Sequence, residues 1–364
     1  MKVAAIDAVP FRIPLLHPVK FAVGEIGHLE HILVRIRSGE GLEGWAEAPA
    51  RQMIYGETIK SMVAAIEDHF APALRGLDFH NVEEAWHRME RLPGNHCAKA
   101  GVDMALHDLI AKAAGLPLRQ LLGGYSRSIE VCHILGTGAP AEVAAQAADL
   151  RGRFGLRWFK LKGGMDPRGD TAMIAAVRDA LGSDAQLTVD CNQAYPAHIA
   201  ERLVEEWDRF DLAWIEEPCA GADPQGRGRV ARACRTPLML DESAFLPRDV
   251  AAEAMLGNCR IAAVKMARTG ITKSRKVLAL AEVHGMRTVV GGQAESELGA
   301  MFGAHFAAAH RATAQSAAEL SFFLDATERI TTESLQIVDG KITLPDQPGI
   351  GLDLDEDRLR RCLM

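Results

Sequence analysis

The spacing of apolar and polar positions changes about a third of the way along the chain. From about residue 129, short apolar runs typical of strands alternate with stretches of helical periodicity; Ile199, Leu203 and Trp207, for example, share one helix face. The runs end on charged residues, namely Lys162, Asp190, Glu216, Asp241, Lys265, Glu295 and Glu319. Successive ends are 28, 26, 25, 24, 30 and 24 residues apart. One strand, one helix and two short loops need about 25 residues, so each interval predicts one βα unit.

These ends, with a first strand at 129–134, predict a closed barrel. In such a barrel the C-terminal ends of all strands surround one mouth, so residues distant in sequence become neighbours. An open doubly wound sheet uses similar units but does not bring all its strand ends together. We therefore predict an α/β fold, a (β/α)7–8 TIM-like barrel over 126–329.

Residues 1–125 show the mixed pattern of an α+β capping domain. Alternating runs at 3–6, 32–36 and 42–46 predict an antiparallel meander, and helical spacing follows at 59–70, 82–89 and 99–114. Two apolar segments, 14–24 and 49–56, look too irregular for strands and are interpreted as lids. The tail, 330–364, contains a predicted hairpin at 335–344. It has no barrel position left, so we expect it to pack back on the capping domain.

Composition excludes several classes of protein. The 364 residues are 48% apolar and 24% charged, as in an ordinary globular protein. The net charge of -7 is spread along the chain, which predicts neither a nucleic-acid partner nor a membrane partner. The seven cysteines lack zinc-type spacing and are interpreted as free thiols, and no apolar run approaches the roughly 20 residues of a membrane span. These features predict a cytoplasmic protein.

Three of the charged strand ends predict a metal site. Asp190, Glu216 and Asp241 end consecutive strands, and hard oxygen ligands in this arrangement suit Mg²⁺ or Mn²⁺. Each carboxylate alone is equally consistent with capping the helix that follows its strand. Three of them at matched strand ends favour the metal.

The lysines add proton transfer to this prediction. Lys160 and Lys162 are two residues apart on one strand and therefore point to the same face, where mutual repulsion is expected to depress a lysine pKa. A solvated surface pair is the alternative. Lys265 is expected across the mouth. Together these residues predict an enzyme that binds a carboxylate substrate on a cation, stabilises the enediolate and moves a proton with lysine.

This set resembles the enolase superfamily, and within it the muconate lactonizing enzyme subgroup. The shared pattern is Lys-x-Lys on the second strand, Asp, Glu and Asp as metal ligands, and a lysine on the sixth strand. The resemblance also includes 51–57, 95–108 and the tail, and so covers essentially the whole chain. It implies that Lys162 and Lys265 form the acid/base pair and that Lys160 is the electrostatic partner of Lys162. It places Asn192 and Glu242 beside the metal ligands, and Glu217 is expected to face away toward the helices.

The last two strand ends narrow the choice within the family. A member resembling mandelate racemase carries a histidine at the seventh strand end, whereas this chain has Gly-Gly-Gln-Ala-Glu at 291–295. Dipeptide epimerases carry Asp-x-Asp at the eighth, because two carboxylates hold an α-ammonium. Here the eighth reads Glu319-Leu320-Ser321. The missing second acid favours a substrate without an ammonium group, and 318–324 resembles cycloisomerase sequences.

The resemblance therefore implies a muconate cycloisomerase that interconverts cis,cis-muconate and muconolactone. We also expect a small-molecule carboxylate substrate and a homo-oligomer. The alternatives are a racemase or epimerase of N-acylamino acids, a related carboxylate dehydratase, and an inactive barrel that only binds a metal or a partner. Candidate substrate contacts are Lys20, Phe21, Ile54, Tyr55, Glu295, Glu319 and Ser321.

Overall fold

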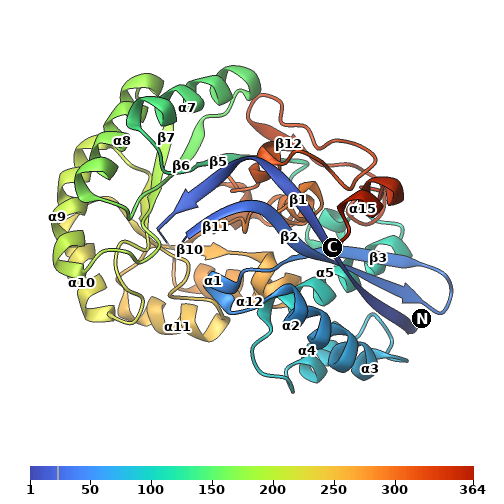
Figure 1. Cartoon of the computed structure of the whole chain (residues 1–364). Helices are drawn as coiled ribbons and strands as arrows, with labels where there is room; N and C mark the ends of the chain where they lie inside the picture. The colour runs from blue at the N-terminus through green and yellow to red at the C-terminus, as the bar shows by residue number, and fades with distance from the viewer. Residues whose placement is uncertain (23) are drawn as a thin grey trace.

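The computed structural model describes residues 1–22 and 24–364. Its N-terminal part is a three-stranded antiparallel sheet in the order β1-β2-β3, with strands β1 (Val3–Phe21), β2 (Gly24–Ser38) and β3 (Glu43–Pro49). The prediction that 14–24 is too irregular for strands is wrong. β1 covers 14–21 of this segment with a register shift between Pro14 and Val19, because an edge strand tolerates prolines that donate no hydrogen bond; Val23 lies outside the described residues. The β1–β2 hairpin crosses in front of the second part of the molecule (Figure 1).

Helical segments follow this sheet along the chain. They are α1 (Gln52–Tyr55), α2 (Ile59–Ala64), the π-helical turn η1 (Ala65–Phe70), α3 (Ala71–Leu74), α4 (Val82–Met89), α5 (His96–Ala113) and α6 (Leu118–Leu122). Of these, α2, η1, α3 and α5 pack against the strands. Helix α5 packs closely on the sheet because Gly101 leaves no side chain between them. A Cβ there would lie 2.8 Å from the Cβ of Ala48.

The second part is a curled sheet of seven parallel strands surrounded by helices (Figure 1). Its strands, in the order β11-β10-β9-β8-β7-β6-β5, are β5 (Cys132–Leu135), β6 (Trp158–Lys162), β7 (Gln186–Asp190), β8 (Trp214–Glu216), β9 (Leu238–Leu240), β10 (Ile261–Val264) and β11 (Arg287–Val290). The intervening helices are α7 (Pro140–Phe154), α8 (Pro167–Leu181), α9 (Ala197–Trp207), the 3₁₀ turn η2 (Asp208–Phe210), α10 (Pro224–Ala233), α11 (Pro247–Leu256), α12 (Met266–Val283), α13 (Glu297–Ala309) and α14 (Arg311–Ala314). The predicted succession of βα units is confirmed.

The eighth barrel position is a short connector, not a full strand. Glu319 donates its N–H to the carbonyl of Val290 at 2.9 Å, and Ala318 accepts from the N–H of Cys132 at 2.8 Å. These bonds link β11 to β5 around the ring. The 3₁₀ turn η3 (Phe322–Asp325) follows at once.

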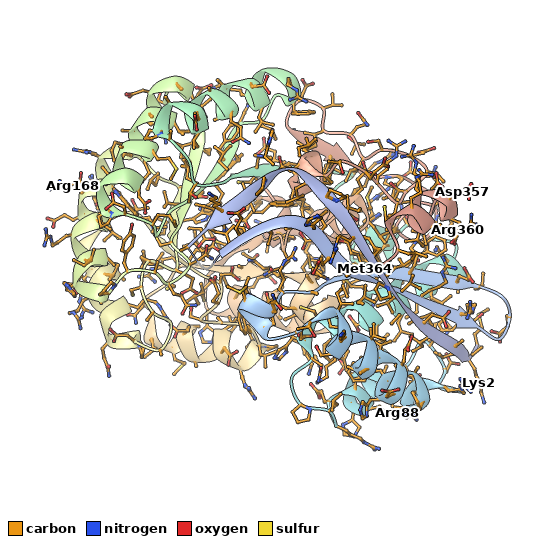
Figure 2. All side chains as sticks on the ribbon, viewed as in Figure 1. Lys2, Arg88, Arg168, Asp357, Arg360 and Met364 are labelled. Atoms are coloured by element: carbon orange, nitrogen blue, oxygen red, sulfur yellow. The ribbon has the colours of Figure 1, made fainter. Side chains whose placement is uncertain are left out.

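The predicted first strand, 129–134, is wrong as a single element. It is divided between β4 (Ser128–Glu130), outside the barrel, and β5, inside it, and β4 pairs antiparallel with β12 (Lys341–Thr343) of the tail. The predicted hairpin at 335–344 is reduced to one bridge around Asp339 and Gly340, both of which have positive φ. The tail then continues to α15 (Glu356–Cys362), which contacts β1. Figure 2 shows charged side chains of α15, α4 and α8 pointing outward.

The barrel interior explains why the charged strand ends converge. Trp214 and Glu216 are two residues apart on β8 and therefore both point to its inner face. Trp214 belongs to a separate apolar cluster in the lower barrel with Met239, Ile261, Ala263 and Val289. Apolar residues therefore fill the lower part, and the polar residues lie above them at the C-terminal mouth. Among the described residues, no helix is long and apolar enough to cross a membrane.

Candidate active site

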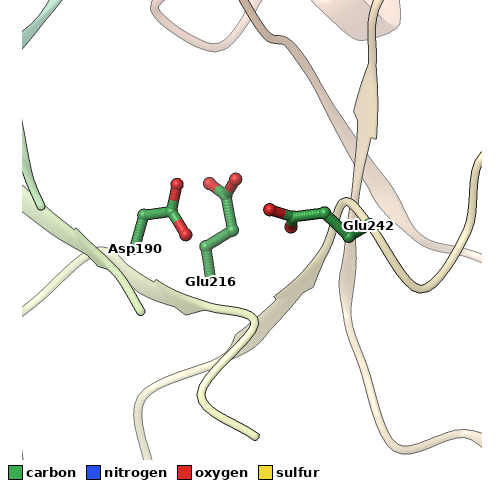
Figure 3. A group of neighbouring side chains, drawn as sticks. All are labelled: Asp190, Glu216 and Glu242. Atoms are coloured by element: carbon green, nitrogen blue, oxygen red, sulfur yellow. The ribbon is translucent and has the colours of Figure 1, made fainter. Parts of the chain in front are cut away.

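The three strands predicted to carry metal ligands bring carboxylates to one place, but the third carboxylate of the group is that of Glu242 instead of Asp241. Asp190 and Glu216 are register partners on neighbouring strands. Oxygens of Asp190, Glu216 and Glu242 lie within 4.8 Å of one another (Figure 3). Oε1 of Glu216 and Oε2 of Glu242 are buried and lack a hydrogen-bond donor in the described part of the chain, while Oε2 of Glu216 faces the ammonium of Lys160 at 2.6 Å. Buried carboxylate oxygens without donors are costly, and a divalent cation would satisfy them.

Asp241, the third predicted ligand, is occupied by cations of the chain itself. Its two oxygens pair with Nζ of Lys265 and with Nη1 of Arg268, each at 2.5 Å. Burial disfavours the charged carboxylate, but these two cations outweigh burial and hold the pKa of Asp241 well below its ordinary value. A metal ion would therefore compete with Lys265 and Arg268 for Asp241. Its role as a ligand stays a prediction.

Lys160 lies at the centre of the acidic cluster and is almost completely buried. Its Nζ is 2.6 Å from Glu216, 3.0 Å from Glu319 and 3.4 Å from Asp190. Burial favours the neutral amine, yet the surrounding carboxylates outweigh burial and raise the pKa of Lys160 well above its ordinary value. The expectation that repulsion between lysines depresses a pKa is thus wrong for Lys160. Its ammonium lies within 3.4 Å of the carboxylates of Glu216, Glu319 and Asp190.

The two predicted acid/base lysines come from opposite sides of the ring. Lys162 donates to Asp190 at 2.5 Å and to Oδ1 of Asn192 at 3.1 Å, and Lys265 pairs with Asp241. Burial opposes the charge on Lys265, but the attraction of Asp241 prevails and raises the pKa of Lys265. Lys162 ends β6 and Lys265 directly follows β10, and these two strands are four positions apart in the sheet order. The space between the two amines is therefore the floor of the mouth.

The resemblance places Asn192 and Glu242 beside the metal ligands. Asn192 donates its N–H to Asp190 at 2.9 Å, but Glu242 is itself one of the three clustered carboxylates. Nδ2 of Asn192 donates to Oε1 of Glu242 at 2.6 Å. Burial, followed by the negative charges of Asp241 and Asp190, raises the pKa of Glu242 to about 8. Asn192 has a positive φ of 42°, a strained conformation that is often found at functional sites.

Sequence reasoning missed two residues that organise this cluster. Glu217, expected to face away, is fully buried and accepts the backbone N–H of Asp241 at 2.6 Å and of Ser243 at 2.9 Å. It thereby fixes the loop that carries Asp241. Arg268 is one turn beyond Lys265 on α12. The doublet of acids at Glu216 and Glu217 was visible in the sequence, but only the positive φ of Glu217 (39°) turns the second acid inward.

A cavity of about 590 Å³ opens above the lysines. Lys162, Lys265, Asn192, Asp241 and Glu242 line its floor. Its outer walls come from the β1–β2 hairpin, from α1 and the start of α2, and from the loop after β11. The C-terminal Met364 also lines it and is labelled near the centre of Figure 2.

Two of the predicted substrate contacts reach this cavity. Phe21 lines it with its ring centroid 5.7 Å from Nζ of Lys162, and Ile54 lines it from α1. Lys20 does not line it. Its side chain is 61% exposed and lies 3.7 Å from Glu25, while its carbonyl accepts the N–H of Thr137. Tyr55 is not among the lining residues either; its hydroxyl accepts from Nε2 of Gln293 at 2.6 Å.

The remaining three predicted contacts are buried beside the cavity. Glu319 is bound to Lys160. Ser321 contacts Nδ1 of His133 at 2.9 Å and donates to the carbonyl of Cys132. Glu295 accepts the N–H of Gln293 at 2.6 Å, and burial raises the pKa of Glu295 to about 7. None of the three lines the cavity.

Comparison with known proteins agrees with this geometry. Residues 5–123 match the N-terminal domain of the mandelate racemase / muconate lactonizing enzyme family, and residues 142–358 match the enolase C-terminal domain-like family. The chain belongs to the mandelate racemase / muconate lactonizing enzyme family. The relatives that it resembles, an epimerase and a muconate cycloisomerase among them, are isomerases. This similarity favours an enzyme over the alternative of an inactive barrel.

Its relatives differ in the reaction they catalyse. The muconate lactonizing enzyme from Mycobacterium smegmatis, solved with muconolactone, has a TM-score of 0.97 and 39% identity over 100% of both chains. The L-Ala-D/L-Glu epimerase of Bacillus subtilis is 32% identical over 97% of each chain. The dipeptide epimerase from Enterococcus faecalis V583, solved with Mg and L-Leu-L-Tyr, has a TM-score of 0.92 and 27% identity over 97% of this chain and 100% of that one.

Proposed function

We propose that the protein is a muconate cycloisomerase that interconverts cis,cis-muconate and muconolactone. The observation that carries this proposal is the eighth barrel position. Glu319 is held by Lys160, and Ser321 is turned toward His133. Among the described residues, neither side chain of this position lines the cavity, so it offers no pair of acids for an α-ammonium. The similarity to the M. smegmatis enzyme supports the same substrate.

The acidic cluster would hold the cofactor. We propose that Asp190, Glu216 and Glu242 hold Mg²⁺ or Mn²⁺, with Asp241 as the further predicted ligand. A divalent ion bound there would draw charge from a substrate carboxylate and so ease proton transfer at the adjacent carbon. The Lys160 ammonium, within 3.4 Å of Asp190 and Glu216, offsets part of the negative charge of this cluster.

The lysines would move the proton. In ring closure, an oxygen of one muconate carboxylate bonds to C4 of the diene, and an electron pair shifts to the carbon next to the other carboxylate. The ammonium of Lys162 or Lys265 gives its proton to that carbon and becomes an amine. Ring opening reverses each step, with the amine removing the same proton. The ring of Phe21 lies 5.7 Å from Nζ of Lys162 and provides an apolar wall beside this exchange.

A second candidate is a racemase or epimerase of N-acylamino acids. Lys162 and Lys265 on opposite sides of the floor favour it, because inversion of an α-carbon needs a base on each face. N-Acylation also removes the ammonium group, so the features of Glu319 and Ser321 are compatible with this candidate. The cavity of about 590 Å³ has room for a substrate longer than muconate.

The two candidates are separated by parallel assays of the purified protein with Mn²⁺. Loss of the diene absorbance of cis,cis-muconate supports the cycloisomerase. In D₂O, proton NMR of N-succinyl and N-acetyl amino acids reports α-proton exchange. Exchange without muconate turnover would replace the first candidate by the second. The proposed homo-oligomer is tested separately by sedimentation equilibrium.

A further inference from the structure

The helix α1 is the part of the cavity wall with the least support of its own. It has four residues, none of them buried, and no side chain caps its N-terminus. A helix of one turn is unstable in isolation because nucleation fixes several residues for a single hydrogen bond. Yet Gln52, Met53 and Ile54 all line the cavity. Contacts outside the helix must hold it in place.

Arg51, directly before α1, provides the first contact. Its Nε and Nη2 donate to the carbonyl of Gln293, and Nη2 also donates to the carbonyl of Ala294 at 3.0 Å. The loop that accepts these bonds is itself fixed from the other side. Glu47 of β3 accepts the N–H of Ser296 at 2.9 Å and of Gly299 at 3.1 Å. Arg51 therefore ties α1 to a rigid part of the barrel.

Tyr55, the last residue of α1, provides the second contact. Nε2 of Gln293 donates to its hydroxyl at 2.6 Å, and its ring packs edge-on against Phe245 with centroids 5.1 Å apart. Gln293 is only 6% exposed. It thus binds both ends of α1, through its carbonyl at Arg51 and through its amide at Tyr55.

We infer that Gln293 is a positioning residue that latches α1 to the loop after β11. The latch joins Gln52–Ile54 and Gly292–Ala294 into one wall and so sets the width of the cavity beside Lys265. Tyr55 acts through this latch and does not contact the substrate. Specificity then depends on the pair Tyr55 and Gln293, even though the reacting atoms lie against other residues.

Hydrogen exchange of the substrate-free protein tests the latch without reference to any substrate. The reporters are the N–H groups of Ile54 and Tyr55, which bond to the carbonyl of Arg51, and of Gly56, which bonds to the carbonyl of Gln52. Tyr55→Phe and Gln293→Met each remove one partner and keep the side-chain bulk. Each variant is expected to raise exchange at these amides about threefold to tenfold, the worth of one hydrogen bond. The double variant is expected to exchange no faster than Tyr55→Phe alone, because that substitution already removes the bond to Gln293 together with the contact of the hydroxyl with Arg268. Tyr125→Phe, at an exposed tyrosine, is the matched control and should change nothing.

A kinetic test rests on the proposed function. With cis,cis-muconate, both single variants should raise KM about threefold to tenfold and leave kcat nearly unchanged, since the wall binds substrate but moves no proton. Unchanged exchange in both variants, or additive effects in the double variant, would overturn the latch. Faster exchange with no muconate turnover in the wild type would keep the latch and reject muconate as the substrate. If one variant does not fold, the other decides by the same exchange criterion.

Discussion

Removal of the Lys160 ammonium tests how the site is balanced before a metal binds. Lys160 is 1% exposed and lies within 3.4 Å of Asp190, Glu216 and Glu319. Lys160→Met keeps the length of the side chain but leaves these carboxylates without their counter-charge. Breaking a buried ion pair by deleting one partner costs about 3–5 kcal/mol. In EDTA, the variant should therefore unfold roughly 5–15 °C below the wild type.

The metal provides the internal control for this prediction. In the wild type, the Lys160 ammonium and a divalent ion compete for Glu216 and Asp190, whereas in Lys160→Met the ion meets no competing ammonium at Glu216 and only Lys162 at Asp190. Saturating Mn²⁺ should therefore stabilise the variant more than the wild type and narrow the difference in melting temperature. Differential scanning calorimetry in EDTA and in Mn²⁺ measures both gaps.

A surface variant is the matched control. Lys276 pairs with Glu83 at 2.9 Å, and both side chains are exposed, so Lys276→Met should change stability by less than about 1 kcal/mol. Equal stability of Lys160→Met and the wild type in EDTA would refute the argument. A difference in melting temperature that is the same in Mn²⁺ as in EDTA would also refute it, because Lys160 and the ion would then not bind the same carboxylates.

Two further predictions concern the loop of Asp241 and the pH dependence of stability. Glu217→Ala leaves the N–H groups of Asp241 and Ser243 without an acceptor, so it should lower the free energy of unfolding by about 3 kcal/mol and weaken Mn²⁺ binding in titration calorimetry. Glu217→Gln keeps an acceptor oxygen and should restore most of the stability and most of the Mn²⁺ affinity. Equal losses of stability and affinity in the two variants would contradict this role. His305 accepts the N–H of Arg119 through Nδ1, and burial lowers its pKa from 6.5 to about 4, so its contribution to stability is complete above pH 6.5 and falls as the pH drops toward 4. From pH 7 to pH 5, the free energy of unfolding measured with urea should therefore fall by about 2 kcal/mol more in the wild type than in His305→Gln. Parallel pH profiles of the two proteins would show that the pKa of His305 is not lowered.

The sequence predicted the features that depend on short repeats. Evenly spaced charged ends such as Lys162, Asp190 and Glu216 predicted the βα units, because each unit is local and has a nearly constant length. Alternation along β6 placed Lys160 and Lys162 on one face. The structure brings these side chains together at the mouth, as the spacing predicted.

Features that depend on distant partners were not predictable in the same way. The segment 14–24 looked irregular because its prolines hide a strand that only pairing with β2 reveals. The division of 129–134 depends on β12, about 200 residues away along the chain. The inward turn of Glu217 depends on a positive φ that its sequence does not signal. Lys20 is excluded from the cavity because it lies on β1 between Val19 and Phe21, which both line the cavity, and successive residues of a strand point to opposite faces.

The central claim is that a lysine moves a proton at the carbon next to a carboxylate. Its most direct test is the lactonisation of cis,cis-muconate in D₂O with Mn²⁺, followed by NMR of the muconolactone. We predict one deuteron on the carbon next to the free carboxylate, in a single configuration. One of the two variants Lys162→Ala and Lys265→Ala, the one that removes the lysine facing that carbon, should incorporate deuterium about 10²–10⁴-fold more slowly. Deuteration in both configurations, or at an undiminished rate in both alanine variants, would contradict the account.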